Sequence, residues 1–243
     1  MIPETMISKS IAVLAYHKIG NAPGEWQTWS YVTADIFKNH LETLKRSGWK
    51  IISYQNFSEG LANPTMLPDK SLLISFDDGY RNNLTVALPI LKEYNYNGVM
   101  FVPTNFVGGY NAFDADIFYE PKELMCTWEE LINLENCGIS IQSHGVNHVH
   151  LSELSETELE KELLLSKTTL EHKLRKNIDS ISYPYGDWGK DFSLTEKQLL
   201  KAGFKSAFLY GGGPFKTNNY HPFQISRIAI GPDTDIKKEL ARY

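Results

Sequence analysis

The sequence predicts an α/β fold in which parallel strands close into a barrel surrounded by helices. Short apolar segments alternate with amphipathic segments along the chain, and about eight of the apolar ones have the character of strands. Each is a continuous run without regular polar alternation, which is typical of strands buried on both faces. An open, doubly wound sheet is the alternative, because the number of strands does not show whether the sheet closes.

The predicted elements follow one another in a regular order. Strands are expected at 11–16, 50–53, 72–76, 99–102, 139–143, 180–183, 206–209 and 225–230. One helix is expected over 34–47, where apolar residues repeat at helical spacing. Another is expected over 83–94, with Pro89 either kinking it or delaying its start.

Capping boxes mark the starts of three further helices. In such a box a serine or threonine caps the first turn, and a glutamate or glutamine three residues later returns the bond. The boxes are Thr127 with Glu130, Ser155 with Glu158, and Thr195 with Gln198. Gly138 and Gly203 end the first and the last of these helices.

Composition and charge exclude several classes of protein. Hydrophobic residues make up 42% of the 243 residues and charged residues 22%, as in ordinary soluble globular proteins. The 24 basic and 29 acidic residues give a net charge of −5, which excludes a dedicated nucleic-acid-binding protein. No apolar run approaches the roughly 18 residues that span a bilayer. No repeat or linker interrupts the chain, so a single domain over 1–243 is expected.

The first residues lead to an expectation about location. Residues 1–10 lack the basic segment of an export signal, and the apolar run 11–16 is shorter than the roughly 7–15 residues of a signal-peptide core. The chain as given is therefore expected to be cytoplasmic. It is expected to be extracytoplasmic if an export signal has been removed from it.

Polar residues that can carry chemistry follow the predicted strands directly. His17 follows the first strand, Asp77 and Asp78 the third, His144 and His148 the fifth, and Tyr185 the sixth. In a parallel barrel the carboxyl ends of the strands share one rim, where catalytic groups lie. We therefore expect these side chains to converge on one site.

The adjacent carboxylates Asp77 and Asp78 suggest a division of labour. Two neighbouring negative charges after an apolar strand are costly unless a positive charge compensates them. If one of them binds a metal ion, the other is left to act as a base on a water that the metal activates. The alternative is a simple turn, because Asp-Asp-Gly is also good turn chemistry.

His144 and His148 are four residues apart. On a helical turn that spacing directs both imidazoles to the same side. Together with Asp78 they would form a His-His-carboxylate metal site with one position open for water. Two unrelated histidines are the alternative, and His150 is expected to be a bystander.

His17 can act as a proton donor, because the ordinary pKa of histidine lies near neutrality. A hydrogen-bonded, inert cap on the first strand is the alternative. Other catalytic signatures are missing from the sequence, among them G-x-S-x-G, the Walker loop and G-x-G-x-x-G. The loop 211–214 is either a lid or a long turn.

Three motifs resemble those of the NodB-homology polysaccharide deacetylases, the fourth carbohydrate esterase family. They are 75–79 (Ser-Phe-Asp-Asp-Gly), 144–148 (His-Gly-Val-Asn-His) and 183–186 (Tyr-Pro-Tyr-Gly). Three further segments, 15–19, 127–131 and 226–228, are similar to the branch that includes the biofilm poly-β-1,6-N-acetylglucosamine deacetylases. The resemblance extends over roughly residues 11 to 231.

The resemblance implies a fold, a reaction and a role for each site residue. The fold would be a distorted (β/α) barrel with about seven repeats. The reaction would be hydrolysis of N-acetyl groups on an N-acetylglucosamine glycan, with a divalent ion, Zn²⁺ before others, on Asp78, His144 and His148. Asp77 would be the base, the backbone N–H of Tyr185 would stabilise the oxyanion, and His17 would be the acid. The late Leu-x-His motif that supplies the acid in the commoner type is missing, and in the biofilm branch the acid comes from the N-terminal Tyr-His motif, which His17 matches.

Two positions depart from the family pattern. Ser182 stands where the commoner pattern has an arginine that orients the catalytic aspartate, and Arg227 is the expected replacement. Gly145 stands where serine or threonine usually supports the metal-binding loop. Each departure leaves room for a different substrate or weaker activity.

Two other functions remain open at this stage. One is hydrolysis of another amide or of O-acetyl groups at the same metal site, and the other is a weakly active carbohydrate-binding relative. Four aromatic residues near the rim suit stacking against sugar rings, namely Trp26, Trp29, Tyr80 and Trp188. The expected partner is therefore a carbohydrate rather than a nucleic acid or a membrane, and the sequence predicts no oligomeric state.

Overall fold

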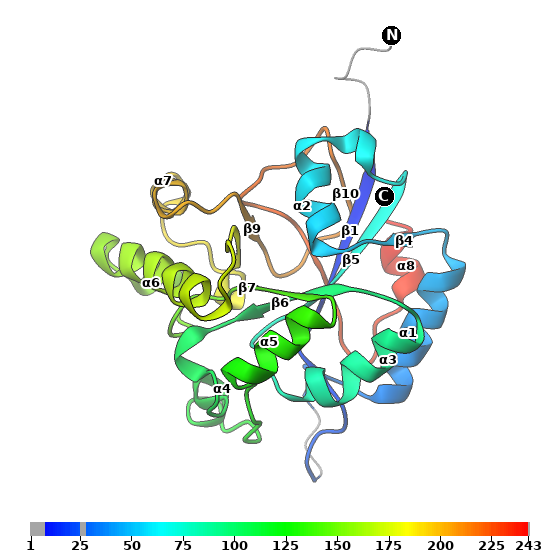
Figure 1. The fold of residues 1–243 in the computed structure, drawn as a ribbon, viewed down its shortest axis with the longest axis horizontal. Coiled ribbons are helices and arrows are strands. Elements are labelled where there is room, and N and C mark those ends of the chain that lie inside the picture. The colour runs from blue at the N-terminus through cyan, green and yellow to red at the C-terminus, as the bar shows by residue number, and fades with distance from the viewer. Residues whose placement is uncertain (1–7, 25–27, 243) are drawn as a thin grey trace.

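The computed structural model describes residues 8–24 and 28–242, and a curled sheet of mostly parallel strands lies at its centre (Figure 1). The parallel strands are β1 (Ser10–Tyr16), β5 (Lys70–Phe76), β6 (Gly98–Val102), β7 (Ile139–Ser143), β8 (Ser180–Ser182), β9 (Ser206–Phe208) and β11 (Ile228–Ala229). β1 and β5 pair along their whole length, whereas β7 and β8 share one aligned pair of residues. These unequal ladders distort the barrel.

The segment 225–229 joins the two ends of the curled sheet. Ile225 pairs with Phe208 of β9 in a parallel bridge, and β11 pairs in parallel with Leu14 and Ala15 of β1. The predicted barrel, in the distorted form that the family resemblance implied, is therefore confirmed over an open doubly wound sheet.

Some short strands differ from the prediction. β4 (Lys50–Ile51) has no place of its own in the ring, because it pairs with the first half of β5 while β6 pairs with the second half. Of the predicted strand 225–230, only β11 forms a ladder. The first residue of the predicted strand, Ile225, pairs with β9, whereas β11 pairs with β1. Three two-residue strands give no apolar run in the sequence: β2 (Lys18–Ile19), β3 (Tyr31–Val32) and β10 (Phe215–Lys216).

Most helices lie around the outside of the sheet (Figure 1). They are α1 (Ala34–Arg46), α2 (Tyr54–Ala62), α3 (Leu88–Glu93), α4 (Ala112–Ala115), α5 (Trp128–Asn136), α6 (Glu156–Leu174), α7 (Phe192–Ala202) and α8 (Ile236–Leu240). The capping boxes predicted for α5 and α6 are both present. Pro89 lies in the first turn of α3, after a π-helical turn over Asn83–Ala87. The predicted helix therefore forms from Asn83 onward, and the proline does not delay its start but follows a π-helical turn.

The capping box predicted for α7 at Thr195 and Gln198 is wrong. α7 begins earlier, because the Asp191 side chain caps it by accepting bonds from the N–H groups of Ser193 and Leu194. An aspartate is as good an N-cap as a threonine. Thr195 therefore lies inside the helix, where its side chain is buried.

Alternation along β1 and β5 decides which side chains reach the barrel axis, since successive side chains of a strand face opposite sides. Ile11, Val13 and Leu73 belong to the hydrophobic cluster inside the sheet, whereas their neighbours along each strand pack beneath the outer helices. Continuing in steps of two residues along the same sides leads to His17 after β1 and to Asp77 after β5. Both therefore project toward the axis at the carboxyl ends of their strands.

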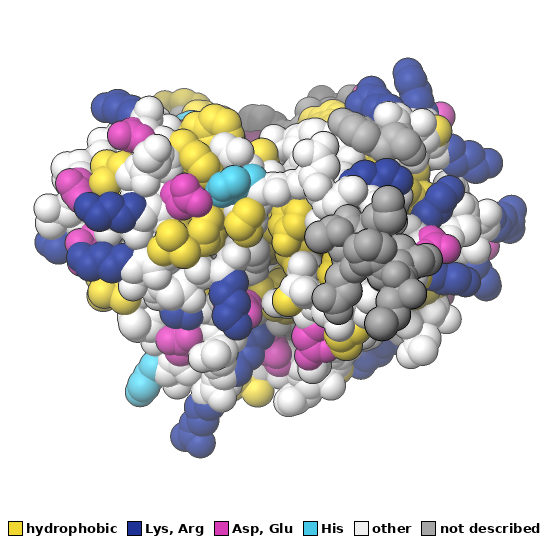
Figure 2. Space-filling view, turned by 90° about the horizontal axis from the view of Figure 1, so that it is seen from above, with side chains coloured by type: hydrophobic (Ala, Val, Ile, Leu, Met, Phe, Trp, Pro, Cys, Tyr) yellow, Lys and Arg dark blue, Asp and Glu magenta, His cyan; other side chains and the backbone are white. Residues whose placement is uncertain are grey.

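One face of the molecule is mixed in character. On the face seen in Figure 2, basic, acidic and hydrophobic side chains are intermingled. Such a surface agrees with the modest net charge and differs from the basic stripe of a nucleic-acid-binding protein. Among the described residues, no helix combines the length and the hydropathy that a bilayer-spanning helix needs.

Candidate active site

Asp77 and Asp78 leave the end of β5 in different directions. The Asp77 N–H donates to the carbonyl of Tyr16 on β1 at 2.9 Å, which continues the pairing of the two strands. Asp78 and Gly79 then adopt φ angles of 71° and 82°, a left-handed backbone that turns the chain away from the strand. Because of this turn, two carboxylates that are adjacent in sequence serve different partners.

Asp77 pairs with Arg227 inside the protein. Arg227 Nη1 donates to Asp77 Oδ1 at 2.8 Å, and Nη2 donates to Oδ2 at 2.7 Å. Arg227 is fully buried, and it also donates to the Leu209 carbonyl and to the Ser182 hydroxyl. Two parallel charge-assisted bonds fix the carboxylate in one orientation. Burial raises the pKa of Asp77, but the Arg227 guanidinium outweighs it, so the pKa stays below its usual value.

The guanidinium missing at Ser182 is thus supplied from another segment. Arg227 precedes β11, at the junction that joins the two ends of the sheet, and reaches the carboxylate beside Ser182. The Ser182 hydroxyl lies 3.4 Å from Asp77 Oδ2. A serine at this position leaves room for the guanidinium and gives it a hydrogen-bond acceptor.

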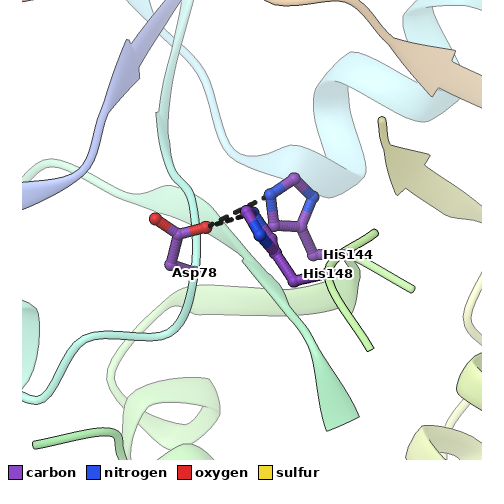
Figure 3. Close-up of side chains that lie close together, drawn as sticks. All are labelled: Asp78, His144 and His148. Carbon is purple, nitrogen blue, oxygen red and sulfur yellow. Dashed lines mark ion pairs between the residues drawn. The ribbon is translucent and has the colours of Figure 1, made fainter. Parts of the chain in front are cut away.

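Asp78, His144 and His148 bring three donor atoms together (Figure 3). Asp78 Oδ1 lies 3.3 Å from His144 Nε2 and 3.1 Å from His148 Nε2. All three side chains are buried, and the three donor atoms lie within 4.8 Å of one another. The structure therefore brings together the three residues expected to bind a metal.

The protonation of the donor atoms suits a divalent ion. His144 Nδ1 lies 2.8 Å from the Ser182 carbonyl, and because a carbonyl only accepts, this nitrogen carries the proton and Nε2 keeps its lone pair. Asp78 Oδ1 is buried and has no hydrogen-bond partner among the described residues. A carboxylate oxygen without a partner that faces imidazole nitrogens is a donor set typical of zinc sites.

The two histidines lie on a loop and not on the helical turn that their spacing suggested. Gly145 and His148 have φ angles of 79° and 52°, left-handed values that a right-handed helical turn does not contain. The loop doubles back after β7, so that the two imidazole rings meet edge to face with centroids 4.9 Å apart. The two imidazoles converge as predicted, but the prediction that a helical turn brings them together was wrong.

Glu162 of α6 holds this loop, and the sequence analysis did not identify it. Its Oε1 accepts from the N–H groups of Val146 and Asn147 at 2.7 and 2.6 Å, and its Oε2 accepts from the Asn147 side chain at 2.8 Å. A Cβ at Gly145 would lie 2.8 Å from Glu162 Oε1. The glycine therefore makes room for the carboxylate, which takes over the support expected from a serine or threonine.

Glu162→Gln is expected to weaken metal binding by roughly 10–100-fold, the usual effect of losing a group that orients metal ligands. Glutamine keeps the shape but loses the charge, and its amide nitrogen cannot accept from the loop. Calorimetric titration with zinc measures the change. Glu160→Gln on the same helix is the control, because it removes only an ion pair with Lys201. Unchanged zinc affinity in the Glu162 variant would show that the loop holds its shape without the carboxylate.

His17 directly follows β1. Its imidazole ring packs in a T-shaped arrangement with the ring of Tyr210, and the two ring centroids lie 5.3 Å apart. Its Nδ1 is buried and has no hydrogen-bond partner in the described part of the chain. Burial lowers the pKa of His17, although the nearby Asp78 and Asp77 oppose this shift. The residue expected to be the proton donor thus faces the same cavity as both carboxylates.

Tyr185 occupies a tight turn after β8, with a left-handed φ of 58°. The turn's own hydrogen bonds are donated by the N–H groups of Gly186 and Asp187, and the Tyr185 N–H is not one of these donors. The ring packs against His148 at 4.6 Å and stacks on His150 at 4.2 Å. His150, expected to be a bystander, is thus in contact with the residue expected to stabilise the oxyanion.

One cavity of about 180 Å³ is lined by the expected residues His17, Asp77, Asp78, His144, His148 and Tyr185. Its wall also contains Lys18, Asp114 and Glu120, which the sequence analysis did not identify. Lys18 is buried there, paired with Glu120 and placed over the Tyr80 ring at 4.8 Å. The Tyr80 hydroxyl donates to Asp114 at 2.7 Å. Burial and then nearby Asp78 raise the pKa of Asp114 to about 7. No local pattern indicates this wall, because Glu120 lies 102 residues from Lys18 in the sequence.

The aromatic residues expected at the rim are distributed unevenly. Trp29 and Trp188 are 43% and 39% exposed, whereas Tyr80 is buried in the wall of the cavity. Trp26 lies outside the described residues. Trp29 and Trp188 are therefore the exposed rings of this set in the described part of the chain.

The chain matches known proteins in sequence and in fold. Residues 65–206, more than half of the chain, match the family model described as polysaccharide deacetylase. This stretch contains Asp77, Asp78 and the histidine loop, whereas His17 and Arg227 lie outside it.

Individual proteins extend the similarity beyond that stretch. The poly-β-1,6-N-acetyl-D-glucosamine N-deacetylase of Staphylococcus aureus is 29% identical over 210 residues, which cover 83% of this chain and 68% of that protein. The Bacillus subtilis protein YxkH, whose name places it among polysaccharide deacetylases, is 26% identical over 222 residues, covering 91% of this chain and 72% of its own. The structure of the Streptococcus pyogenes deacetylase PplD has a TM-score of 0.79 at 24% identity, over 96% of this chain and 97% of that one, and so shares the fold. With the family match over more than half of its length, this chain belongs to the polysaccharide deacetylase family.

Proposed function

We propose that this protein is a metal-dependent hydrolase that removes N-acetyl groups from N-acetylglucosamine-containing poly- or oligosaccharides and releases acetate. The proposal rests on one observation above all: a single cavity holds a three-donor metal group and, beside it, a separate buried carboxylate, Asp77. Hydrolysis at a metal needs such a base, and sugar binding alone does not. The printed name of the similar Staphylococcus aureus protein supports N-acetylglucosamine as the sugar.

Asp78, His144 and His148 would hold the ion. A bound divalent ion supplies Lewis-acid activation of the acetyl carbonyl and of the attacking water. The same ligands also suit cobalt and nickel, and zinc is proposed first because its catalytic sites combine three protein ligands with one open position.

The chain's own residues would handle the protons and the developing charge. Asp77, kept ionised and oriented by Arg227, would accept the proton of the attacking water. The Tyr185 N–H would donate to the oxyanion that forms on the former carbonyl oxygen. His17 would donate a proton to the departing amine as the C–N bond breaks, and its lowered pKa makes the protonated ring a stronger acid.

We also propose that residues 1–243 form one catalytic domain. β1, near the start, pairs with both β10 and β11, near the end. The proposed site draws on residues from His17 to Arg227, so both ends of the chain contribute to it.

Acetate release from N-acetylglucosamine oligomers tests the proposed function. Zinc-loaded protein is expected to release acetate, and chelator-treated protein is not. Release that persists after the metal has been removed would contradict the metal dependence. No release from the zinc-loaded protein would contradict the N-acetyl substrate, and O-acetylated sugars would then test the ester alternative.

His144→Ala separates metal binding from the rest of the site in this assay. Loss of one of three protein ligands is expected to remove both bound zinc and acetate release. His172→Ala is the matched control, because this exposed histidine lies at the end of α6. Full zinc occupancy in the His144 variant would exclude His144 as a ligand.

A further inference from the structure

We propose that Trp29 is the platform of a second sugar subsite, next to the catalytic cavity, which binds another residue of the same glycan. The inference rests on the proposed function for the identity of the ligand. It is carried by the packing of Trp29 and by a second cavity beside the first.

Trp29 is held so that one face of its indole ring is covered and the side chain stays accessible. The ring lies directly on Gly231, where a Cβ would come within 2.1 to 2.5 Å of its atoms. Its Nε1 donates to Asp233 Oδ1 at 2.7 Å, which fixes the rotation of the ring. The side chain is nevertheless 43% exposed. Because the ring is already fixed on one face, little side-chain entropy is lost when a ligand stacks on the rest of it.

The indole lines a second cavity of about 440 Å³ that adjoins the catalytic one. Trp29 lines the second cavity and Ser30 the first, and in the same way Gly211 lines the second and Tyr210 the first. Consecutive residues at two distant points of the chain thus form the wall between the cavities. At Gly211 this wall has no side chain, and a Cβ there would meet no atom within 4 Å, which leaves a glycan room beside it. Gly212 packs against Ser226, where a Cβ would come within 2.7 Å of the serine Cβ. The loop 211–214, for which the sequence suggested a lid or a turn, thus contributes to this wall.

The polar groups around the indole suit a sugar. Carboxylates from Asp233, Asp235 and Glu239 line the cavity together with the cations Lys238 and Arg242. Carboxylates accept hydrogen bonds from sugar hydroxyls, and a flat ring packs against the C–H face of a sugar. Glu239 is paired with Arg242, so the three carboxylates and two cations leave the cavity with one net negative charge. The site therefore favours a neutral sugar, or one whose amine has already been freed and is positively charged.

The indole N–H signal of Trp29 in nuclear magnetic resonance spectra tests the subsite without catalysis. Trp29→Phe identifies the signal by its loss. In metal-free protein the signal is expected to shift with an N-acetylglucosamine hexamer, and to shift less at the same concentration of the monosaccharide. A signal that does not respond to the hexamer overturns the subsite, whatever the enzyme does. If the signal shifts but zinc-loaded protein releases no acetate, the subsite stands and the proposed function fails.

Kinetics with Trp29→Ala give the second test. The ratio of kcat/KM for the hexamer to kcat/KM for the dimer is expected to fall by roughly fivefold or more, as when a contacting tryptophan is truncated. Leu200→Ala is the control, because this exposed apolar residue lies on α7 and is expected to leave the ratio unchanged. An unchanged ratio in a folded Trp29 variant would overturn the proposal.

Discussion

Asp77→Asn is expected to lower kcat by about 10²–10⁴-fold, the contribution of a positioned general base. Asparagine has nearly the same shape, but it cannot accept a proton from water at neutral pH. It also cannot accept both bonds from Arg227, because its amide nitrogen is a donor. Zinc binding is expected to persist, since Asp77 is not among the three donor atoms. Single-turnover acetate release by zinc-loaded protein measures the loss.

Two controls separate the base from the structure around it. Zinc content and circular dichroism report whether the Asp77 variant is folded and loaded, because an Arg227 that has lost its carboxylate also destabilises the protein. Ser182→Ala removes a neighbour that lies 2.7 Å from Arg227 Nη2 but leaves the carboxylate in place, so its loss of activity should be much smaller. If the folded, loaded Asp77 variant keeps most of its turnover, another group is the base.

Sequence alone could predict the barrel and the meeting place of its polar residues for a simple reason. Parallel strands that are buried on both faces have continuous apolar runs, and their carboxyl ends share one rim. Asp77 and the histidine loop directly follow such runs, so no side-chain detail was needed to bring them together. Short ladders such as β10 contain two residues and no apolar run, and therefore could not be predicted.

The support of the site could not be predicted, because it depends on packing between distant segments. Glu162 is one of many charged residues on α6, and only the folded loop shows that it accepts three hydrogen bonds there. The buried Lys18 pairs with the partly exposed Glu120 only when the chain between β6 and α5 returns to the end of β1. The i, i+4 spacing of the two histidines predicts a helical turn. The glycine that follows the first histidine, Gly145, adopts a left-handed backbone instead, and the spacing alone does not show this.

Arg227→Met is expected to destabilise the protein by about 3–5 kcal/mol, because it leaves the buried Asp77 carboxylate without its counter-charge. It also removes donors from the Leu209 carbonyl and the Ser182 hydroxyl. Urea unfolding of the metal-free protein measures the free energy of unfolding. The double variant with Asp77→Asn is expected to be more stable than the sum of the two single losses predicts, since each single change leaves the other partner uncompensated. Additive losses would contradict the pairing.

Arg227→Lys shows whether the charge or the geometry of the guanidinium matters for turnover. Lysine keeps the positive charge but cannot form two parallel bonds to a carboxylate. It is therefore expected to restore part of the stability lost in Arg227→Met, yet to leave kcat well below that of the original protein. Full recovery of both would mean that Asp77 needs only a nearby charge. Recovery of stability alone would mean that Arg227 aims the carboxylate, and that the serine at position 182 is tolerated because a guanidinium from the other end of the chain does this work.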